Sequence, residues 1–520
     1  SSNGFERINL AKAFSAKVTL SEDGSTITAI SFGAKAPTVV KTASSKDTIT
    51  GLLTDFNKYY VAGKGVTDEG KSVLAHDDQL TEDINNKAYG TDGNTAQDQR
   101  ALSDAQMNST NTLYDALGPV LGKYYKDAAD AGKLPKTAQF LSDMNKSAST
   151  GVAKATYQHP RPYVDRVNFN GTTLNMNGLK QTLNIKKVPG YENFDWGDGE
   201  APDNEYDGLY NSGSFPSGHT TFAFTQGAGL AYLLPELGPE IMTRVSEAGN
   251  NRIVLGVHYP LDIMGGHIAG QYGVATAVSG EKTAQEGAAA RAELVDYLTA
   301  QCKADNHGDT LDACITNTGA NAANGYRNDF TDEVSTRPVT DRASALAAYK
   351  ARMTYGFQAT GTTGQAPVVP DSAVRMLDNV AAFKSLDSAQ KKAVLAATEG
   401  DSGYPLDASS QGWARVNLAA AYSAKVTLSA DGKNVVKVEP GQAQASVVRE
   451  TSGSNGNNGG NGNGGSNAGN TGVNNAAGRN PSSTQPLSKT GADVSGIASA
   501  FILIAAAGVT IMMIRRKHAI

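Results

Sequence analysis

The chain has 520 residues, 39% of them hydrophobic, which is enough to bury at least one large core and to form roughly two to four structural units. Lys and Arg together number 46 and Asp and Glu 51, so the formal net charge is −5. Proteins that bind nucleic acid directly normally carry a basic patch or stripe, so this balance argues against a nucleic-acid partner.

A segment at the start of the chain is repeated further on. Residues 1–24, SSNGFERINLAKAFSAKVTLSEDG, return at 409–432 as SSQGWARVNLAAAYSAKVTLSADG, with 17 of the 24 positions identical. Each copy predicts a short helical stretch, a strand at AKVTL, an Asp-Gly turn and a second alternating strand, so we expect a β-hairpin in each repeat segment, 1–35 and 401–448. Because the first copy starts at Ser1, we hypothesise that it closes a preceding unit.

The pattern over residues 45–300 is mainly helical. Apolar residues recur at helical spacing in stretches such as TNTLYDALGPVLGKYYKDAADAG and FAFTQGAGLAYLLPEL, whereas strand-like alternation is scarce. A polar, turn-rich stretch from about 303 to 340 follows, and helical spacing returns within a predicted helical extension over 301–400. The expected fold is mainly α, a helical bundle with small hairpin-containing repeat segments at both ends.

The sequence contains two cysteines, Cys302 and Cys314, in the polar stretch QCKADNHGDTLDACIT. Two thiols in a polar loop are either free or joined in one local disulfide. The export signal described next favours the disulfide. Redox or metal chemistry is not expected there.

The last part of the chain has the features of a localisation signal. Residues 452–486 are rich in Gly, Asn and Ser and predict a flexible stalk. Within residues 487–520, the sequence LSKTG precedes an uncharged apolar stretch over 494–514, which is long enough to cross a bilayer, and the basic residues RRK follow at once.

This order resembles the cell-wall sorting signal of Gram-positive surface proteins. The resemblance implies that Leu487, Thr490 and Gly491 form the motif, that a sortase cuts between Thr490 and Gly491, and that the protein is joined to peptidoglycan. Ser488 departs from that signal, which usually has Pro at this position. The expected location is extracellular, anchored to the cell wall, or to the membrane through the apolar stretch if the protein is not sorted.

Three short blocks within the helical region combine basic residues, small polar residues and histidines. The blocks are Lys154, six residues, Arg161-Pro162; then Pro216-Ser217-Gly218-His219; then Arg252, five residues, His258, three residues, Asp262. A phosphoryl group in transfer carries dispersed negative charge, which preorganised cations such as Lys154, Arg161 and Arg252 stabilise. The Ser217 hydroxyl and the backbone at Gly218 add neutral donors at a helix start. The pattern therefore predicts a phosphate site.

In this order and at these separations, the blocks resemble the type 2 phosphatidic acid phosphatase (PAP2) superfamily, which includes bacterial class A acid phosphatases and vanadium haloperoxidases. The resemblance implies a phosphatase core over 45–300. It implies that His258 is the nucleophile that becomes a phosphohistidine and that Asp262 orients His258. It also implies that His219 protonates the leaving alcohol and then activates water. Asn251 departs from the family, which usually has Ser there.

Other residues near the blocks have simpler interpretations. His267 is expected to pack within a helix, Gly265 and Gly266 to permit close helix contact, and His159 to lie at most on the rim of the pocket. Pro260 predicts a helix start just after His258.

The segment YENFDWGDGEAPDNEYDGLY, residues 191–210, holds seven carboxylates and is expected to be a solvated loop. A minority hypothesis is that it rims the pocket and selects substrates by charge. The segment 191–210 lacks the ligand order of an EF-hand, and neither HExxH nor paired CxxC occurs in the sequence. No metal and no cofactor are therefore predicted.

The predicted function is an extracellular, metal-independent phosphomonoester hydrolase of the acid phosphatase type. A soluble phosphomonoester is favoured over a membrane lipid because the catalytic region lacks multiple apolar spans. The alternatives are a vanadium-dependent haloperoxidase and a surface adhesin that uses the fold as a scaffold.

Overall fold

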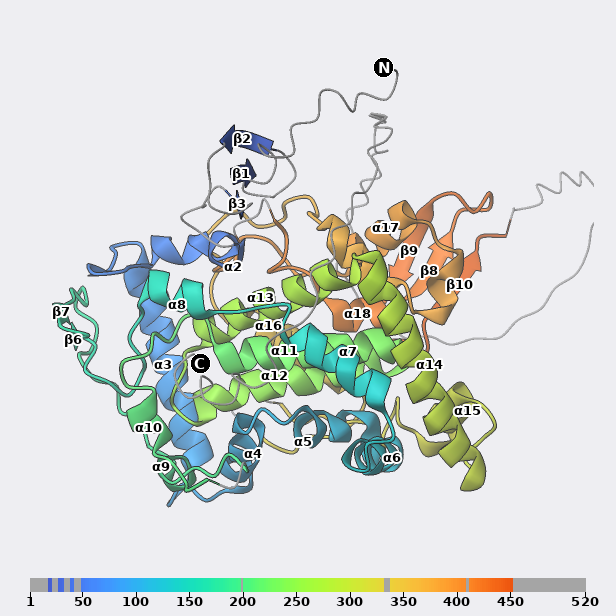
Figure 1. Cartoon of the computed structure of the whole chain (residues 1–520), viewed down its shortest axis with the longest axis horizontal. Coiled ribbons are helices and arrows are strands. Elements are labelled where there is room, and N and C mark those ends of the chain that lie inside the picture. The colour runs from blue at the N-terminus through green and yellow to red at the C-terminus, as the bar shows by residue number, and fades with distance from the viewer. Residues whose placement is uncertain are drawn as a thin grey trace, which may run out of the picture. The chain divides into compact units, whose positions relative to one another are not determined.

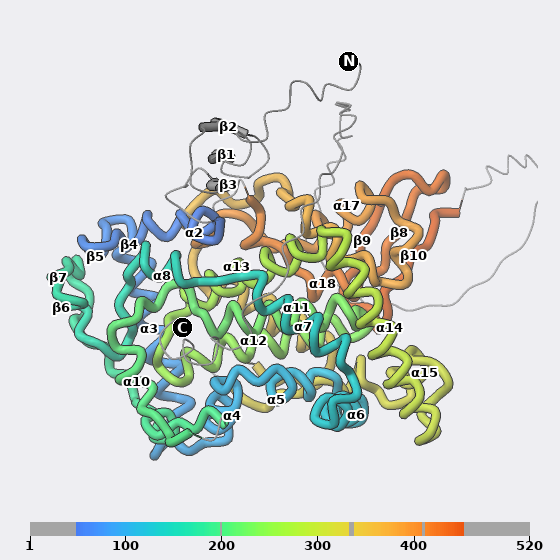
Figure 2. Tube along the Cα trace, in the orientation of Figure 1, coloured from blue at the N-terminus to red at the C-terminus, as the bar shows by residue number. Residues whose placement is uncertain are grey.

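The structure is a computed structural model, and it describes residues 48–197, 200–331, 337–407 and 411–451, together with the backbone of three strands between residues 17 and 41 (Figures 1 and 2). The elements below all belong to one compact unit that includes Ser1–Glu450. Among the described residues, no helix is long and apolar enough to cross a membrane. The stalk, the sorting motif and the apolar stretch over 494–514 lie outside the described residues.

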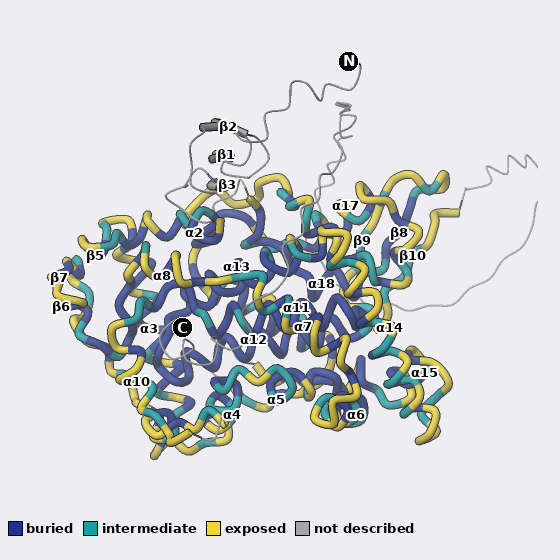
Figure 3. The backbone as a smooth tube through the Cα atoms, viewed as in Figure 1, coloured by how far each residue is buried: buried dark blue, intermediate teal, exposed yellow. Residues whose placement is uncertain are grey.

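Three helices form the centre of the unit: α11 (Gly218–Leu233), α12 (Gly238–Val254) and α13 (Pro260–Val278). Nearly all of their residues are buried, and Figure 3 shows their tubes in dark blue, surrounded by more exposed segments. A helix that is buried on every side needs either apolar residues all round or paired polar ones. Helices α11 and α13 are mostly apolar, whereas the polar residues of α12 are paired.

Buried ion pairs hold α12 in place. Glu240 pairs with Arg342 at 2.7 Å, Arg244 with Asp104 at 2.6 Å, and Glu247 with Arg100 at 2.5 Å. Removing one partner from such a pair leaves an uncompensated buried charge, which costs about 3–5 kcal/mol. The polar residues of α12 therefore determine which outer helices can pack on it.

Glycines allow α11 and α13 to approach closely. A methyl group at Gly266 would lie 2.8 Å from the backbone oxygen of Ser217, and one at Gly270 would lie 2.9 Å from that of Thr221. These separations are shorter than an ordinary contact, so the predicted role of Gly266 in close helix packing is confirmed. The close approach also brings the first turns of the two helices together.

Outer helices cover this centre, and the fold is mainly α, as predicted (Figure 1). The α-helices are α2 (Thr48–Leu52), α3 (Gly70–Tyr89), α4 (Ala96–Ala105), α5 (Ser109–Leu113), α6 (Gly118–Asp130), α7 (Pro135–Asn145), α8 (Gly151–Tyr157), α9 (Pro189–Glu192), α10 (Glu205–Gly208), α14 (Glu281–Ala304), α15 (Leu311–Thr318), α16 (Arg342–Thr354), α17 (Ser388–Thr398) and α18 (Leu418–Tyr422). Short 3-10 helices lie at η2 (Thr54–Lys58), η3 (Tyr114–Leu117), η4 (Pro235–Leu237), η5 (Asp371–Leu377) and η6 (Ala381–Ser385).

Each repeat segment contributes its hairpin to a three-stranded sheet, whose third strand follows residue 35 in the first copy and ends just past residue 448 in the second. The first contains β1 (Lys17–Leu20), β2 (Ile27–Ser31) and β3 (Thr38–Lys41) in the order β2-β1-β3, and the second contains β8 (Lys425–Leu428), β9 (Val435–Glu439) and β10 (Ser446–Arg449) in the order β10-β8-β9. The middle strand pairs antiparallel with the second and parallel with the third, and the register shifts at the same Thr-Leu step in both copies. The predicted hairpins are confirmed, but the third strand was not predicted, because a strand that pairs parallel with the middle strand is not marked by a hairpin turn in the sequence. Two smaller hairpins pair β4 (Tyr60–Val61) with β5 (Gly65–Val66) and β6 (Asn168–Phe169) with β7 (Thr172–Thr173).

The second repeat segment is part of the main core. Its residues Trp413, Leu418 and Tyr422 are buried, and the Tyr422 hydroxyl donates to the Met376 carbonyl at 3.1 Å. Helix α18 packs beside α12, although more than 150 residues separate them in the chain (Figure 2).

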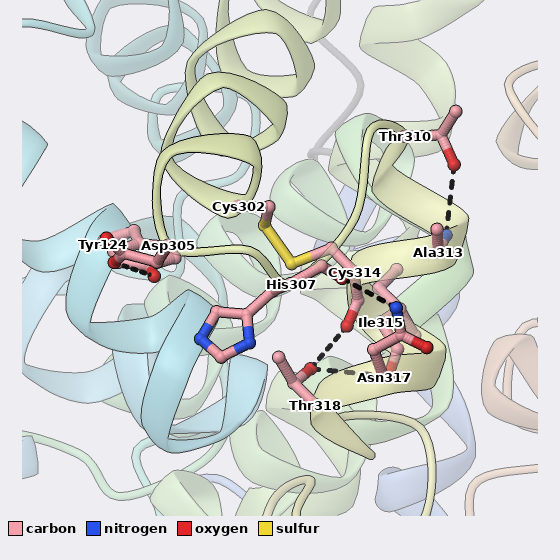
Figure 4. Close-up of a disulfide and its surroundings, with 10 residues drawn as sticks. All are labelled: Tyr124, Cys302, Asp305, His307, Thr310, Ala313, Cys314, Ile315, Asn317 and Thr318. Carbon is pink, nitrogen blue, oxygen red and sulfur yellow. Dashed lines mark hydrogen bonds between the residues drawn. A yellow bond between two sulfur atoms is a disulfide. The ribbon is translucent and has the colours of Figure 1, made fainter.

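A disulfide joins Cys302 at the end of α14 to Cys314 in α15 (Figure 4). Both cysteines are fully buried, so the expectation of a polar loop around them is wrong. Residues Leu311, Cys314 and Ile315 recur at helical spacing, and the Thr310 hydroxyl caps the helix by accepting from the Ala313 amide at 3.1 Å. The many polar residues between these positions hid that short helical pattern.

Candidate functional site

The three blocks meet where α12 ends and where α11 and α13 begin. Lys154 lies in α8 and Arg161 just after it; Ser217 caps α11, and Gly218 and His219 form its first turn; Arg252 lies in the last turn of α12; His258 precedes α13, and Asp262 lies in its first turn. The Ser217 amide donates to the Asp262 carbonyl at 3.0 Å, which ties the two helix starts together. The structure therefore brings together all eight residues that the blocks predict.

His258 is held as a neutral imidazole with a defined tautomer. Its Nδ1 atom lies 3.0 Å from Asp262 Oδ2, and its Nε2 atom lies 3.1 Å from Arg161 Nη1. A guanidinium can only donate, so Nε2 must be the unprotonated nitrogen and Nδ1 must carry the hydrogen that Asp262 accepts. Burial lowers the pKa of His258 well below its ordinary value, and Arg161 and Lys154 lower it further. The lone pair of Nε2 is thus available for attack.

Backbone carbonyls position Lys154 and Arg161. Lys154 Nζ donates to the carbonyls of Gly213 and Ser214 at 2.7 and 3.2 Å. Arg161 donates to the carbonyls of Val257, Ser212 and Leu209 at 2.9, 3.0 and 3.2 Å. Burial lowers the pKa of Lys154 well below its ordinary value, with Arg161 as the next cause, and a bound anion would raise that pKa again.

Arg252 has hydrogen-bond donors that no described residue uses. Its Nη2 atom donates to the Tyr191 hydroxyl at 2.8 Å, and its guanidinium lies 5.3 Å from the centre of the Tyr191 ring. Its Nε and Nη1 atoms are buried and bond to no atom of the described residues. Buried donors without a partner are rare and costly in native proteins. An anion bound beside Arg252 would satisfy one of these two donors.

His219 faces the end of another helix. Its Nε2 atom lies 3.2 Å from the carbonyl oxygen of Ala105, the last residue of α4. A carbonyl only accepts, so Nε2 carries the hydrogen and Nδ1 is the nitrogen that can exchange a proton with a ligand. Burial lowers the pKa of His219 well below its ordinary value, followed by Arg252 and Arg161, whereas the Ala105 carbonyl raises it.

Ser217 is the N-cap residue of α11. Its hydroxyl oxygen accepts from the Thr220 amide at 3.2 Å and from the Thr220 hydroxyl at 2.9 Å. These contacts leave the hydroxyl hydrogen of Ser217 for an acceptor in the site, next to the backbone of Gly218 at the positive end of α11.

Asn251 connects the site to α4. Its Nδ2 atom donates to Asp104 Oδ2 at 2.7 Å, and Asp104 precedes the carbonyl that holds His219. Asn251 thus links the Arg252 turn to the support of His219 through one hydrogen bond.

The segment 191–210 is only partly the solvated loop that was expected. Tyr191, Phe194 and Tyr206 are buried, and the Trp196 ring lies 6.4 Å from the ring of His219. Among its described carboxylates, Glu192, Asp195, Glu200 and Asp207 are exposed, whereas Asp203 and Glu205 are half-buried. The aromatic residues interspersed in this acidic segment were the signal that it packs against the site.

Sequence reasoning missed one buried group and misplaced another. Ser214, which precedes the Pro-Ser-Gly-His block, donates to Asp262 Oδ1 at 3.2 Å. His159 lies 2.9 Å from the Ser214 hydroxyl and is buried, so its assignment to the pocket rim is wrong. His267 packs within a helix as predicted, stacked on Phe224 and bonded to Tyr349 at 3.0 Å.

Metal independence stays a prediction. In the part of the chain that the structure describes, no three His, Cys, Asp or Glu side chains are grouped so that they could hold a metal ion.

Known proteins share this region of the chain. Residues 138–284 match the family described as the PAP2 superfamily. The chain is 33% identical over 205 residues to an acid phosphatase of Zymomonas mobilis, a match that covers 38% of this chain and 61% of the relative. It is 27% identical over 189 residues to a non-specific acid phosphatase of Providencia stuartii, covering 35% of this chain and 61% of the relative. The chain thus spans about three fifths of the length of the curated relatives it matches. All eight converging residues lie within residues 138–284, the part of this chain that is similar to the PAP2 superfamily.

Proposed function

We propose that this protein is an extracellular phosphomonoester hydrolase of the acid phosphatase type, acting through a phosphohistidine intermediate. One observation carries the proposal: the unprotonated Nε2 of His258 lies near three buried cationic side chains, one of which has two buried donors that bond to no described atom. The relatives are named acid phosphatases, which agrees with this chemistry.

In the first step, phosphate oxygens bind to Arg252, Lys154 and the Ser217 hydroxyl, and they draw Arg161 away from the lone pair of His258. The Nε2 atom then attacks phosphorus, a P–N bond forms, and the P–O bond to the alcohol breaks. Asp262 stabilises the positive charge that develops on the ring by accepting from Nδ1.

The leaving alcohol needs a proton, and His219 delivers it from Nδ1. Before phosphate binds, His219 is neutral, because burial and nearby cations depress its pKa. A phosphomonoester carries one proton below pH about 6, so it can bring that proton into the site and pass it to His219. The bound phosphate also offsets the cations and so favours protonated His219. This route predicts better turnover at acid pH.

In the second step, water replaces the alcohol. His219, now neutral, takes a proton from the water through Nδ1, and the oxygen attacks the phosphohistidine. The P–N bond breaks, inorganic phosphate leaves with the proton that His219 took from water, and both histidines return to their starting tautomers.

The test is hydrolysis of an aryl phosphate by the purified protein with a chelator present, comparing wild type with His258→Ala. His307→Ala, beside the disulfide, is the matched control (Figure 4). Chelator-resistant turnover lost only in His258→Ala, with an acid-labile phosphoenzyme trapped by rapid base quench, is the expected result. An inactive wild type that oxidises halide once vanadate is added would instead identify a haloperoxidase. A wild type that is inactive in both assays would favour the surface adhesin.

The location is part of the proposal and rests on the sequence of residues 487–520. Sortase cleavage of a peptide containing LSKTG, and its loss in Thr490→Ala, would support wall anchoring. A protein recovered only in the membrane fraction of the source cells would favour anchoring through the apolar stretch.

A further inference from the structure

A line of three hydrogen bonds leads from His159 to the histidine nucleophile. His159 Nδ1 lies 2.9 Å from the Ser214 hydroxyl oxygen, that oxygen lies 3.2 Å from Asp262 Oδ1, and Asp262 Oδ2 lies 3.0 Å from His258 Nδ1. All four side chains are buried. Two of them, His159 and Ser214, have no part in the steps described above.

The donors in this line all point toward Asp262. An ionised carboxylate only accepts, so the Ser214 hydroxyl donates its one hydrogen to Asp262 and must accept from His159. The Nδ1 atom of His159 therefore carries a proton. Burial, with Arg166 as the second cause, lowers the pKa of His159 to about 3, so this ring stays a neutral donor across the acid range.

We propose that His159 and Ser214 are positioning residues that hold the Asp262 carboxylate in the orientation that serves His258. The inference rests on the proposed function. Asp262 Oδ2 accepts from His258 and from the Tyr259 amide, both at 3.0 Å, and the bond from Ser214 secures the other oxygen. With both oxygens bound, the carboxylate cannot turn away, and His258 keeps its hydrogen on Nδ1.

The same bonds oppose protonation of Asp262. Burial raises its pKa to about 7, whereas the Tyr259 amide, Lys154, Arg161 and the Ser214 hydroxyl oppose that rise. Asp77, a second buried carboxyl on α3, accepts from the Leu261 amide at 3.0 Å, and its own pKa is raised by burial and by Asp262. Losing the Ser214 donor should raise the pKa of Asp262 further, so that its carboxylate is protonated at a higher pH.

The packing around His159 offers a substitution that removes only the donor. The ring contacts three aromatic rings, with centroid distances of 5.3 Å to Phe56, 4.7 Å to Tyr60 and 5.0 Å to Tyr259. His159→Phe keeps an aromatic ring in this cage and removes the N–H group. His267→Phe is a matched control, because His267 is equally buried and neutral but is bonded to Tyr349 and Gln271.

The experiment measures kcat/KM against pH for aryl phosphate hydrolysis by wild type, Ser214→Ala, Ser214→Thr, His159→Phe, the Ser214→Ala/His159→Phe double variant and the control. In Ser214→Ala the pH at which activity falls on the acid side should rise by about one unit, and kcat should fall about tenfold at mildly acid pH with KM little changed. Ser214→Thr should restore the wild-type profile. His159→Phe should show a smaller shift in the same direction, and the double variant should match Ser214→Ala, because His159 acts through Ser214.

Other outcomes separate the two proposals. The positioning role would be overturned if Ser214→Ala left the acid side of the pH profile of kcat/KM unchanged. It would also be overturned if the losses of kcat/KM in the two single variants simply multiplied in the double variant. The proposed phosphatase activity would stand in both cases. A wild type without turnover, or turnover that survives His258→Ala, would remove the proposed function and this role with it. If His159→Phe fails to fold by circular dichroism, the comparison of Ser214→Ala with Ser214→Thr decides.

Discussion

Replacing Arg252 by Lys tests the phosphate site most directly. Arg252 has two buried donors, Nε and Nη1, that bond to no described atom, while Nη2 is occupied by the Tyr191 hydroxyl. Nη2 carries a second N–H, so the guanidinium can present that group together with the parallel N–H of Nε or of Nη1 to a phosphoryl group, whereas an ammonium is a point charge on a flexible stem. Each hydrogen bond to a charged group contributes about 1.5–3 kcal/mol. Losing one of the two should lower kcat/KM by about 10-fold to 150-fold.

The assay has a second readout that does not depend on turnover. Inorganic phosphate at 100 times its Kd should stabilise the wild type by about 2.7 kcal/mol, seen as a raised Tm, and Arg252→Lys should shrink this gain at the same phosphate concentration. The matched control is Arg352→Lys. Arg352 is also buried with two donors that lack a described partner, but it bonds to the Ser246 hydroxyl at 2.9 Å and belongs to α16 rather than to the site.

Two results would refute this reasoning. One is an Arg252→Lys variant whose kcat/KM and phosphate-induced Tm gain both stay within threefold of wild type. The other is an equal loss of phosphate stabilisation in Arg352→Lys, because the effect would then report a general disturbance of α12 and not a phosphate contact.

Three further predictions concern stability. Because burial raises the pKa of Asp262 to about 7, its folded form binds a proton more tightly than its unfolded form, so ligand-free stability should fall as pH rises from about 4 to 7; Asp262→Asn should reduce this slope, on the order of 2–4 kcal/mol in total, as measured by urea unfolding at several pH values. Gly266→Ala places a methyl group 2.8 Å from the Ser217 oxygen and should cost about 1–3 kcal/mol with a loss of activity, whereas an unchanged Tm would show that the helices separate freely. Replacing Cys302 and Cys314 by Ser opens a link across 12 residues and should lower stability by about 2–4 kcal/mol while leaving kcat at 25 °C unchanged, since the disulfide lies outside the site.

Local chemistry explains which parts of the fold could be predicted. Ser217 caps α11 through an amide three residues away, and Pro260 starts α13 through its own restricted backbone angle. The hairpins of the repeat segments likewise depend on one turn and the strands beside it. Such features need only neighbours within a few residues, so their pattern is visible in the sequence.

Prediction failed where a residue's environment comes from distant elements. The buried polar face of α12 makes sense only beside Asp104, Arg100 and Arg342, which are contributed by two other helices. The segment 191–210 looked solvated because its carboxylates outnumber its aromatic residues, yet the aromatic residues decide how it packs.

By itself, the sequence determined the helical character of the core, the hairpins, and the residue types that converge on phosphate. Only the tertiary structure decided how those residues work together: the free nitrogen of His258, the spare donors of Arg252, and the place of His159 behind Asp262. The physical reason is separation along the chain. His159 and Ser214 are 55 residues apart, and Ser214 and Asp262 are 48 apart, so their hydrogen bonds exist only after α8, α11 and α13 have packed together.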